Sequence, residues 1–207
     1  MLDLKEFSPC LLIAMPQLAD PNFHRTVVLL AEFRPGGSYG VVINRPLEQT
    51  LGAVQSNDVE LAPQYQTAPL WFGGPVNPRQ ALLISNLRPG AEDELPEFDD
   101  TSSSWTDSDA DGAGILLLGN GLALANGKAM LVDYSCDLLG DIFKVVAGYA
   151  GWAGQQLDEE LRAGSWLIAP MDKDLIFSAP DTMWDRALRT LGVDPVTLQA
   201  PPSSVHH

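Results

Sequence analysis

The stretch "GYAGWAGQQLDEELRAGSW", residues 148–166, combines three glycines spaced three residues apart with aromatic side chains and an acidic segment. Glycine permits close backbone approach and left-handed torsions, which suit a corner between a strand and a helix. Tyr149 and Trp152 add apolar area with one polar group each. Leucines four residues apart predict a short helix after the corner, with Gly164 placed to end it. The free N–H groups at the start of that helix could hold an anion. No lysine or arginine lies next to that start in the sequence, however, so the stretch favours architecture over a binding site.

Short apolar runs bounded by glycine and proline predict strands on both sides of this corner. Strands are expected at residues 10–16, 26–33, 39–45, 68–74, 80–86, 114–120, 121–126, 142–150, 166–170 and 175–178. Helices are expected at residues 47–55, 153–164 and 181–191. Strands that follow one another in pairs, with helices gathered late, predict an α+β fold with a mixed, largely antiparallel sheet.

Composition limits the class of protein. The chain has 207 residues, 45% of them hydrophobic, which suffices for a single domain, expected at residues 1–195 and followed by a tail at 196–207. The net charge of −15 disfavours direct nucleic-acid binding, because an acidic surface repels phosphates. Two cysteines indicate the reduced cytoplasm rather than a disulfide framework. No apolar run approaches the roughly 20 residues that span a bilayer, so we expect no membrane association.

The segment at residues 90–112 differs from the rest of the chain. It holds nine of the 27 acidic residues, and no lysine, arginine or histidine lies between Arg88 and Lys128. Serines and threonines fill the gaps between the acids. We expect a mobile, solvated loop here.

Three short motifs resemble known sites but lack a required part. The G-x-S-x-G sequence at 36–40 is followed by a β-branched run, whereas a nucleophile elbow needs a helix there. The acidic sequence DSDADG at 107–112 opens like a calcium loop, but Leu118 stands where the bidentate glutamate is needed. The glycines near Lys128 miss the spacing of a phosphate loop. The sequence therefore predicts no metal and no cofactor.

Polar residues at strand ends are the remaining candidates for a site. His24, the one histidine outside the chain terminus, could act as a general base or could cap a turn. Arg25 and Asn44 are polar neighbours of the same strand ends. Arg45 could hold an anion in a bidentate fork or could form an ion pair that fixes its strand. The turn at Gly73-Gly74 could bring backbone close to a ligand or could serve only as a bend.

Several blocks together resemble one bacterial family. The blocks "MPQLADPNFHRTVVLL", "GVVINRP", "FGGPV", "GYAGWAGQQLDEEL" and "GSWLIAP" occur in order, and with "DLIF" and the last tryptophan-bearing helix they are similar to the AlgH/YqgE family. The resemblance covers about residues 15–192. It implies an α+β fold in which a bent sheet curls into a pseudo-barrel with helices packed on it. The family's signature positions correspond here to His24, Arg25, Thr26, Asn44, Arg45, Pro46, Gly73, Gly74, Pro75, Tyr149, Gly151, Trp152 and Gln156.

The resemblance implies a regulatory role rather than a defined reaction. One member has been described as a transcriptional regulator of polysaccharide production, and no enzymatic activity is firmly attached to the family. The first hypothesis is therefore a non-enzymatic regulatory or binding module, with an unidentified protein or small molecule as its partner. Its tentative ligand-binding residues are His24, Arg25, Asn44, Arg45, Gly73, Gly74, Tyr149 and Trp152. The alternative hypothesis is an enzyme that acts on a small anionic ligand through His24 and Arg45.

Overall fold

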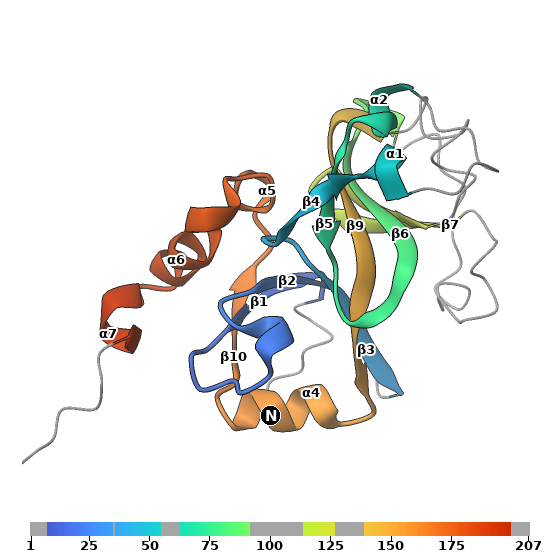
Figure 1. Cartoon of the computed structure of the whole chain (residues 1–207). Helices are drawn as coiled ribbons and strands as arrows, with labels where there is room; N and C mark the ends of the chain where they lie inside the picture. Colours follow the sequence, from blue (N-terminus) through green and yellow to red (C-terminus); the bar gives the residue numbers. More distant parts are fainter. Residues whose placement is uncertain (1–7, 35, 55–62, 92–113, 127–138, 200–207) are drawn as a thin grey trace, which may run out of the picture.

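The computed structural model describes residues 8–34, 36–54, 63–91, 114–126 and 139–199. Their strands form one ten-stranded sheet that runs in the order β10-β1-β2-β3-β9-β6-β8-β7, with β4 and β5 beside it (Figure 1). The strands are β1 (Cys10–Ala14), β2 (Val27–Arg34), β3 (Gly37–Val42), β4 (Pro46–Thr50), β5 (Pro69–Phe72), β6 (Val76–Leu87), β7 (Gly114–Gly119), β8 (Leu122–Asn126), β9 (Leu139–Ala153) and β10 (Trp166–Pro170). The helices are η2 (Pro21–Phe23), α1 (Leu51–Val54), α2 (Pro63–Gln66), α4 (Gln156–Arg162), α5 (Lys173–Ile176), α6 (Pro180–Thr190) and α7 (Pro195–Gln199).

The fifteen-residue strand β9 joins the two halves of the sheet. Its first part pairs antiparallel with β6 and parallel with β5, which is the one parallel pair among the described strands. Its last part, from Ala150 to Ala153, pairs antiparallel with β3. The expected mixed, largely antiparallel sheet is therefore confirmed.

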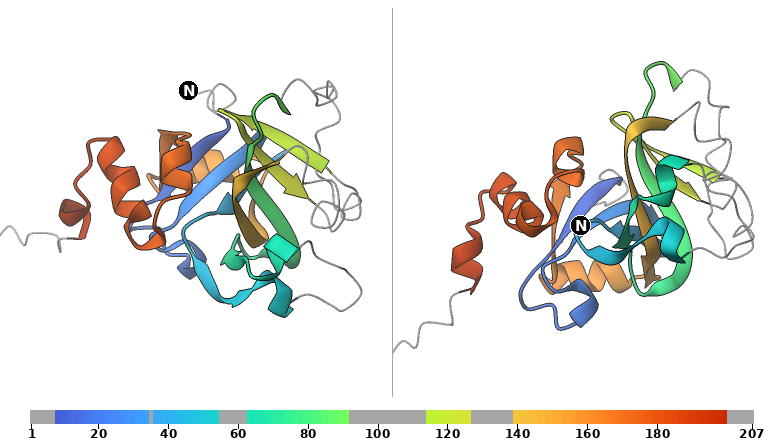
Figure 2. Two further views of the ribbon diagram at one scale, coloured as in Figure 1. Left: turned by 90° about the horizontal axis from the view of Figure 1, so that it is seen from above. Right: turned by 45° about the horizontal axis from the view of Figure 1, so that its top comes forward.

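The helices cover separate parts of this sheet. Helix α6 packs on β1 and β2, while α4 contacts β9 and β10. In both views of Figure 2, the arm formed by α5, α6 and α7 lies on one side of the molecule and β7 and β8 lie on the opposite side. Buried Met183, Trp184, Ala187 and Leu188 form the inner stripe of α6 and join the main hydrophobic core.

A close backbone crossing connects the turn after β5 to the middle of β9. The Gly73 N–H donates to the Ala147 carbonyl at 2.8 Å, and the Val42 N–H donates to the Gly73 carbonyl at 2.7 Å. A β-carbon added at Gly148, which has φ +73°, would lie 2.5 Å from the Gly74 carbonyl oxygen. Added β-carbons at Gly73 or Gly74 would overlap the backbone of Gly148 or Tyr149. Only glycine allows the two chain segments to come this close.

The corner after β9 is held by aromatic rings and one carboxylate. Trp152 and Trp166 meet edge to face, with their ring centroids 5.9 Å apart, and Phe23 contacts both rings. The two indole N–H groups donate to the same Glu160 Oε2 oxygen, at 3.0 and 2.7 Å. Gly164, with φ +74°, follows α4 as expected. Residues 148–153 of this stretch complete β9, so the corner itself lies between Ala153 and Gln156, later in the chain than the glycine spacing suggested.

Several expectations need correction. The predicted strand at 175–178 is wrong, because the Asp172 carboxylate accepts hydrogen bonds from the Asp174 and Leu175 N–H groups and starts helix α5. The predicted helix at 47–55 is wrong in its first half, where β4 pairs with β5. The pseudo-barrel is not confirmed, because the sheet is open, with β10 and β7 at its two ends.

Other expectations fall partly or wholly outside the described residues. Helix α7 occupies the start of the stretch that was expected as a tail at 196–207. Residues 92–113 of the expected acidic loop lie outside the described residues. The division into a domain at 1–195 and a tail therefore stays a prediction.

The crossing at Gly74 generates the first testable prediction. A Gly74→Ala substitution should lower the free energy of unfolding by about 1–3 kcal/mol or more, because the new methyl group overlaps the Tyr149 backbone. Chemical denaturation measures this change. Gly36→Ala is the matched control, since no heavy atom lies within 4 Å of its added β-carbon. Equal stability of the two variants would contradict the close crossing.

The shared carboxylate generates a second prediction. Glu160→Ala removes the acceptor of two partly buried indole N–H groups, and each unsatisfied donor costs about 1–3 kcal/mol. Thermal or urea unfolding should show a loss of about 2 kcal/mol or more. Glu159→Ala is the control: this neighbour is exposed, and its loss should change stability by about 0.5 kcal/mol or less. A Glu160→Ala variant that loses no more stability than Glu159→Ala would show that the two indole N–H groups do not depend on this carboxylate.

Candidate functional site

Asn44 and Arg45 hold the loop before β2 by hydrogen bonds to its backbone. The Asn44 side chain accepts from the Val27 N–H at 2.9 Å and donates to the Arg25 carbonyl at 2.9 Å. The Arg45 guanidinium donates to the carbonyls of Pro21 and His24, at 3.2 and 2.8 Å. Burial lowers the pKa of Arg45, although the nearby Asp20 opposes this effect. Both side chains therefore act as braces for this loop.

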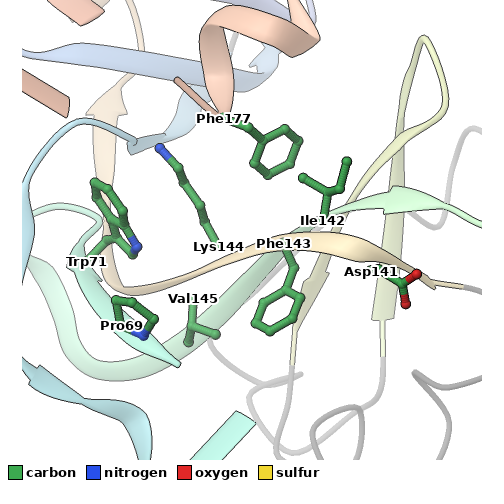
Figure 3. Close-up of a pocket in the computed structure, with 8 residues that line it drawn as sticks. All are labelled: Pro69, Trp71, Asp141, Ile142, Phe143, Lys144, Val145 and Phe177. Atoms are coloured by element: carbon green, nitrogen blue, oxygen red, sulfur yellow. The ribbon is translucent and has the colours of Figure 1, made fainter. Parts of the chain in front are cut away.

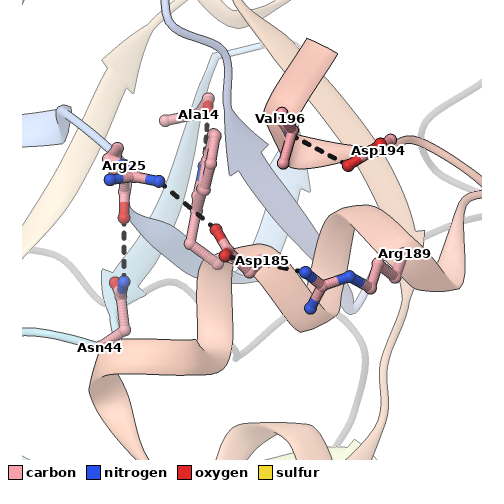
Figure 4. A network of polar contacts seen from close by, with 8 residues as sticks. Ala14, Arg25, Asn44, Asp185, Arg189, Asp194 and Val196 are labelled. Carbon is pink, nitrogen blue, oxygen red and sulfur yellow. Dashed lines mark hydrogen bonds and ion pairs between the residues drawn. The ribbon is translucent and has the colours of Figure 1, made fainter. Parts of the chain in front are cut away.

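Arg25 takes a different role at the same loop. Its backbone is left-handed, with φ +53°, and the Asn44 amide holds it there. Its guanidinium lies over the Trp184 ring, 4.6 Å from the centroid, and pairs with Asp185 at 3.4 Å (Figure 4). The Trp184 N–H in turn donates to the Ala14 carbonyl at 2.8 Å. This group fastens α6 to the sheet.

His24 stands at the surface of this loop. Its side chain is exposed, and in the part of the chain that the structure describes no hydrogen bond or ion pair to its imidazole is found. The structure thus brings His24, Arg25, Asn44 and Arg45 together at one loop, through hydrogen bonds from the Asn44 and Arg45 side chains to the loop backbone.

The remaining candidates lie elsewhere on the fold. Gly73 and Gly74 form the crossing on β9, and the Tyr149 ring packs on Tyr39 with centroids 4.9 Å apart. Trp152 belongs to the aromatic corner beside α4. The eight predicted residues are therefore spread over three places: the loop before β2, the crossing and the corner.

A cavity of about 330 Å³ lies between β5, the start of β9 and the end of α5. Its volume is at the lower end of the range for small-molecule pockets. Figure 3 shows the Lys144 side chain extending between Trp71 and Phe177. The residues that line the cavity are Pro69, Trp71, Asp141, Ile142, Phe143, Lys144, Val145 and Phe177.

Lys144 is the distinctive residue of this cavity. The residue is 5% exposed, and its ammonium group donates to the Ile43 carbonyl at 2.9 Å. The ammonium nitrogen also lies 4.1 Å from the centroid of the Trp71 ring, a cation–π contact. Among the described residues, no carboxylate forms an ion pair with it. Burial lowers the pKa of Lys144 from the ordinary value of 10.5 to about 8.

Near neutral pH the Lys144 amine can act as a hydrogen-bond donor in its charged form or as a nucleophile in its neutral form. A lysine ammonium has three donors, and a backbone carbonyl and an aromatic face occupy only part of its capacity. The charged form can therefore donate to an acceptor placed in the cavity. With a pKa of about 8, a fraction of about one tenth is neutral at pH 7 and carries a free lone pair.

Our sequence analysis did not select Lys144. The available signal was a single lysine inside the apolar run "IFKVVAGYA", on the same strand face as Ile142 and Val146. A charged residue at an inward position of a buried strand needs an explanation, because burial of an unpaired charge is costly. Its partner Trp71 comes from β5, and the pairing of Trp71 with Val146 could not be derived from the pattern.

The described parts of the chain show neither a metal-binding cluster nor a membrane-spanning helix. Within them, no group of three or more His, Cys, Asp or Glu side chains is placed to hold a metal ion. Also within these parts, no helix has both the length and the apolar composition needed to cross a membrane.

Known proteins resemble this chain over nearly its full length. A UPF0301 protein from Myxococcus xanthus is 34% identical over 204 residues, which cover 94% of this chain and 96% of that protein. A UPF0301 protein from Coxiella burnetii is 32% identical and covers 88% of each chain. These relatives share the whole domain rather than one motif.

Solved structures agree with this result. The solution structure of the AlgH protein from Pseudomonas aeruginosa has a TM-score of 0.66 at 28% identity and covers 93% of this chain and 92% of its own. The crystal structure of DIP2367 from Corynebacterium diphtheriae has a TM-score of 0.61 at 19% identity, covering 96% and 97%, and supports the fold alone. The AlgH-like family model matches residues 11–196. The chain therefore belongs to the AlgH-like family.

Proposed function

We propose that this protein is a binding module whose ligand site is the Lys144 cavity. The ligand is a small, largely apolar molecule with one acceptor group, a carboxylate or a carbonyl oxygen. The observation that carries the proposal is the buried Lys144 ammonium, which faces a cavity and has no carboxylate partner among the described residues.

The energetic cost of Lys144 supports a functional role. A buried ammonium without a counter-charge destabilises a fold, and a methionine or leucine at the same place would fill the space without that cost. Strongly shifted titratable groups beside cavities are enriched at functional sites. A ligand acceptor group would supply the counter-charge or acceptor that the described carboxylates do not provide.

The cavity walls set the class of ligand. Trp71 and Phe177 offer aromatic surface beside Lys144, and Pro69 and Ile142 add aliphatic surface, whereas the side chains of Phe143 and Val145 point to the other side of β9 (Figure 3). Asp141 lies at the far end of the group, with its carboxylate turned away from Lys144 (Figure 3). An apolar body can therefore lie against the walls while one acceptor oxygen meets the lysine.

The broader functional hypotheses remain compatible with such a module. The family resemblance implies a regulatory role, and a regulator that senses a small molecule needs only a binding site. The transcriptional role, the cytoplasmic location and the absence of an enzymatic step stay predictions.

The cost of the buried charge can be measured directly. Because the pKa of Lys144 falls from 10.5 to about 8 on folding, the destabilising effect is full below pH 8 and fades as the pH rises from 8 towards 10.5. Relative to Lys144→Met, the wild type should therefore gain about 3 kcal/mol of stability between pH 7 and pH 10.5. Urea unfolding of both proteins across this range gives the difference, with Lys173→Met as the control. A pH-independent difference would contradict the buried charge.

Binding of benzoate tests the proposal itself. Benzoate should stabilise the wild type by about 2.7 kcal/mol when present at a hundred times its Kd. Lys144→Met should abolish this effect, while Lys173→Met on nearby α5 should keep it. Affinity should fall about tenfold between pH 7 and pH 9, because the ammonium form disappears as the pH passes about 8. Equal binding by wild type and Lys144→Met would overturn the assignment of the site.

The alternative from the sequence, an enzyme that acts through His24 and Arg45, stays a prediction. Arg45 is already bonded to two carbonyls of its own chain, whereas the exposed His24 has an accessible imidazole. A reaction that needs His24 as general base should lose at least about a hundredfold in rate in His24→Gln. Arg45→Lys should instead loosen the loop and lower stability. A benzoate response unchanged in His24→Gln keeps the two hypotheses separate.

A further inference from the structure

The Lys144 amine differs from other candidate nucleophiles in the described residues. Cys10 is also buried, but burial raises the pKa of its thiol to about 12, which keeps it protonated and unreactive. The Tyr39 hydroxyl is buried without a hydrogen-bond partner, and burial raises its pKa further above the ordinary value. Lys144, in contrast, places a nucleophilic atom beside a cavity large enough for a small molecule.

We propose that Lys144 captures an aldehyde or ketone of small size as a reversible imine inside this cavity. The inference rests on the proposed function, because it assumes that the cavity is the ligand site. It goes further by naming a carbonyl compound as the ligand class and a covalent bond as the means of retention.

The environment of the amine favours this chemistry. No described carboxylate holds the group in its charged form, and burial lowers its pKa to about 8. An ordinary lysine has a pKa of about 10.4, so at pH 7 the neutral fraction of Lys144 is larger by a factor of roughly two hundred. The hydrogen bond to the Ile43 carbonyl fixes the amine at the cavity wall beside Trp71. Desolvated lysines of this kind are the ones that form Schiff bases.

The step balances without an oxidant or a reductant. The lone pair of the neutral amine attacks the carbonyl carbon, and a proton moves from nitrogen to oxygen to give a carbinolamine. Loss of one water molecule then forms the carbon–nitrogen double bond. Addition of water reverses the sequence and releases the carbonyl compound.

Reductive trapping provides the experiment. The full chain is incubated at pH 7 with benzaldehyde and sodium cyanoborohydride, which reduces an imine to a stable benzylamine. Peptide mass spectrometry then compares the four lysines of the chain, Lys5, Lys128, Lys144 and Lys173. We expect benzylation of Lys144 to exceed that of Lys173 at least tenfold, and benzoate to suppress the Lys144 adduct selectively.

Two lysine variants and the measured binding of benzoate distinguish imine formation from simple ligand binding. Lys173→Arg should leave labelling of Lys144 unchanged, and Lys144→Arg should remove the preferential adduct without changing labelling of Lys173. Benzoate binding together with equal labelling of all lysines would overturn imine capture and leave the binding module intact. No benzoate binding and no preferential labelling would overturn both. Preferential labelling that benzoate fails to suppress would place the reaction outside the cavity and also contradict the inference.

Discussion

The close contact between the turn after β5 and the middle of β9 is the constraint on which the rest of the structure depends. Gly73, Gly74 and Gly148 leave no room for side chains there, so backbone meets backbone. This contact sets β5 parallel to β9 and places Trp71 opposite Val146. Lys144 lies two residues earlier on the same face of β9, so its ammonium meets the Trp71 ring. The crossing therefore builds one wall of the cavity as well as joining the halves of the sheet.

Much of this fold could be predicted because local signals were strong. β-branched runs fixed most strands, and the amphipathic stripe of Trp184 and Leu188 fixed α6. Apolar patterning failed in short segments whose residues suit either a strand or a helix. The apolar run at 175–178 suits a strand, but Asp172 caps its backbone and makes α5 helical. The open ends of the sheet depend on pairing between distant strands, which periodicity does not encode.

The candidate residues show why polar positions mark a site only ambiguously. Asn44 and Arg45 have donors and acceptors suited to a ligand, yet the structure uses them on the carbonyls and N–H groups of the loop before β2. A loop with a left-handed residue such as Arg25 exposes backbone groups that need partners, and nearby polar side chains provide them. Lys144 was missed for the opposite reason: it looked like one exception in an apolar strand. Its significance depends on the lack of an ion pair with any described carboxylate, which the sequence pattern does not show.

The charge of the whole chain favours a weakly charged ligand. A net charge of −15 repels approaching anions, most strongly multiply charged ones, although salt screens this field beyond about 8 Å. A neutral carbonyl compound meets no such repulsion. Burial destabilises the charged form of Lys144. A neutral imine with such a compound would carry no charge on the nitrogen and would therefore avoid this cost. The burial that makes the free ammonium costly would therefore favour the proposed neutral imine, so the acidic surface and the buried amine both favour a neutral carbonyl compound as ligand.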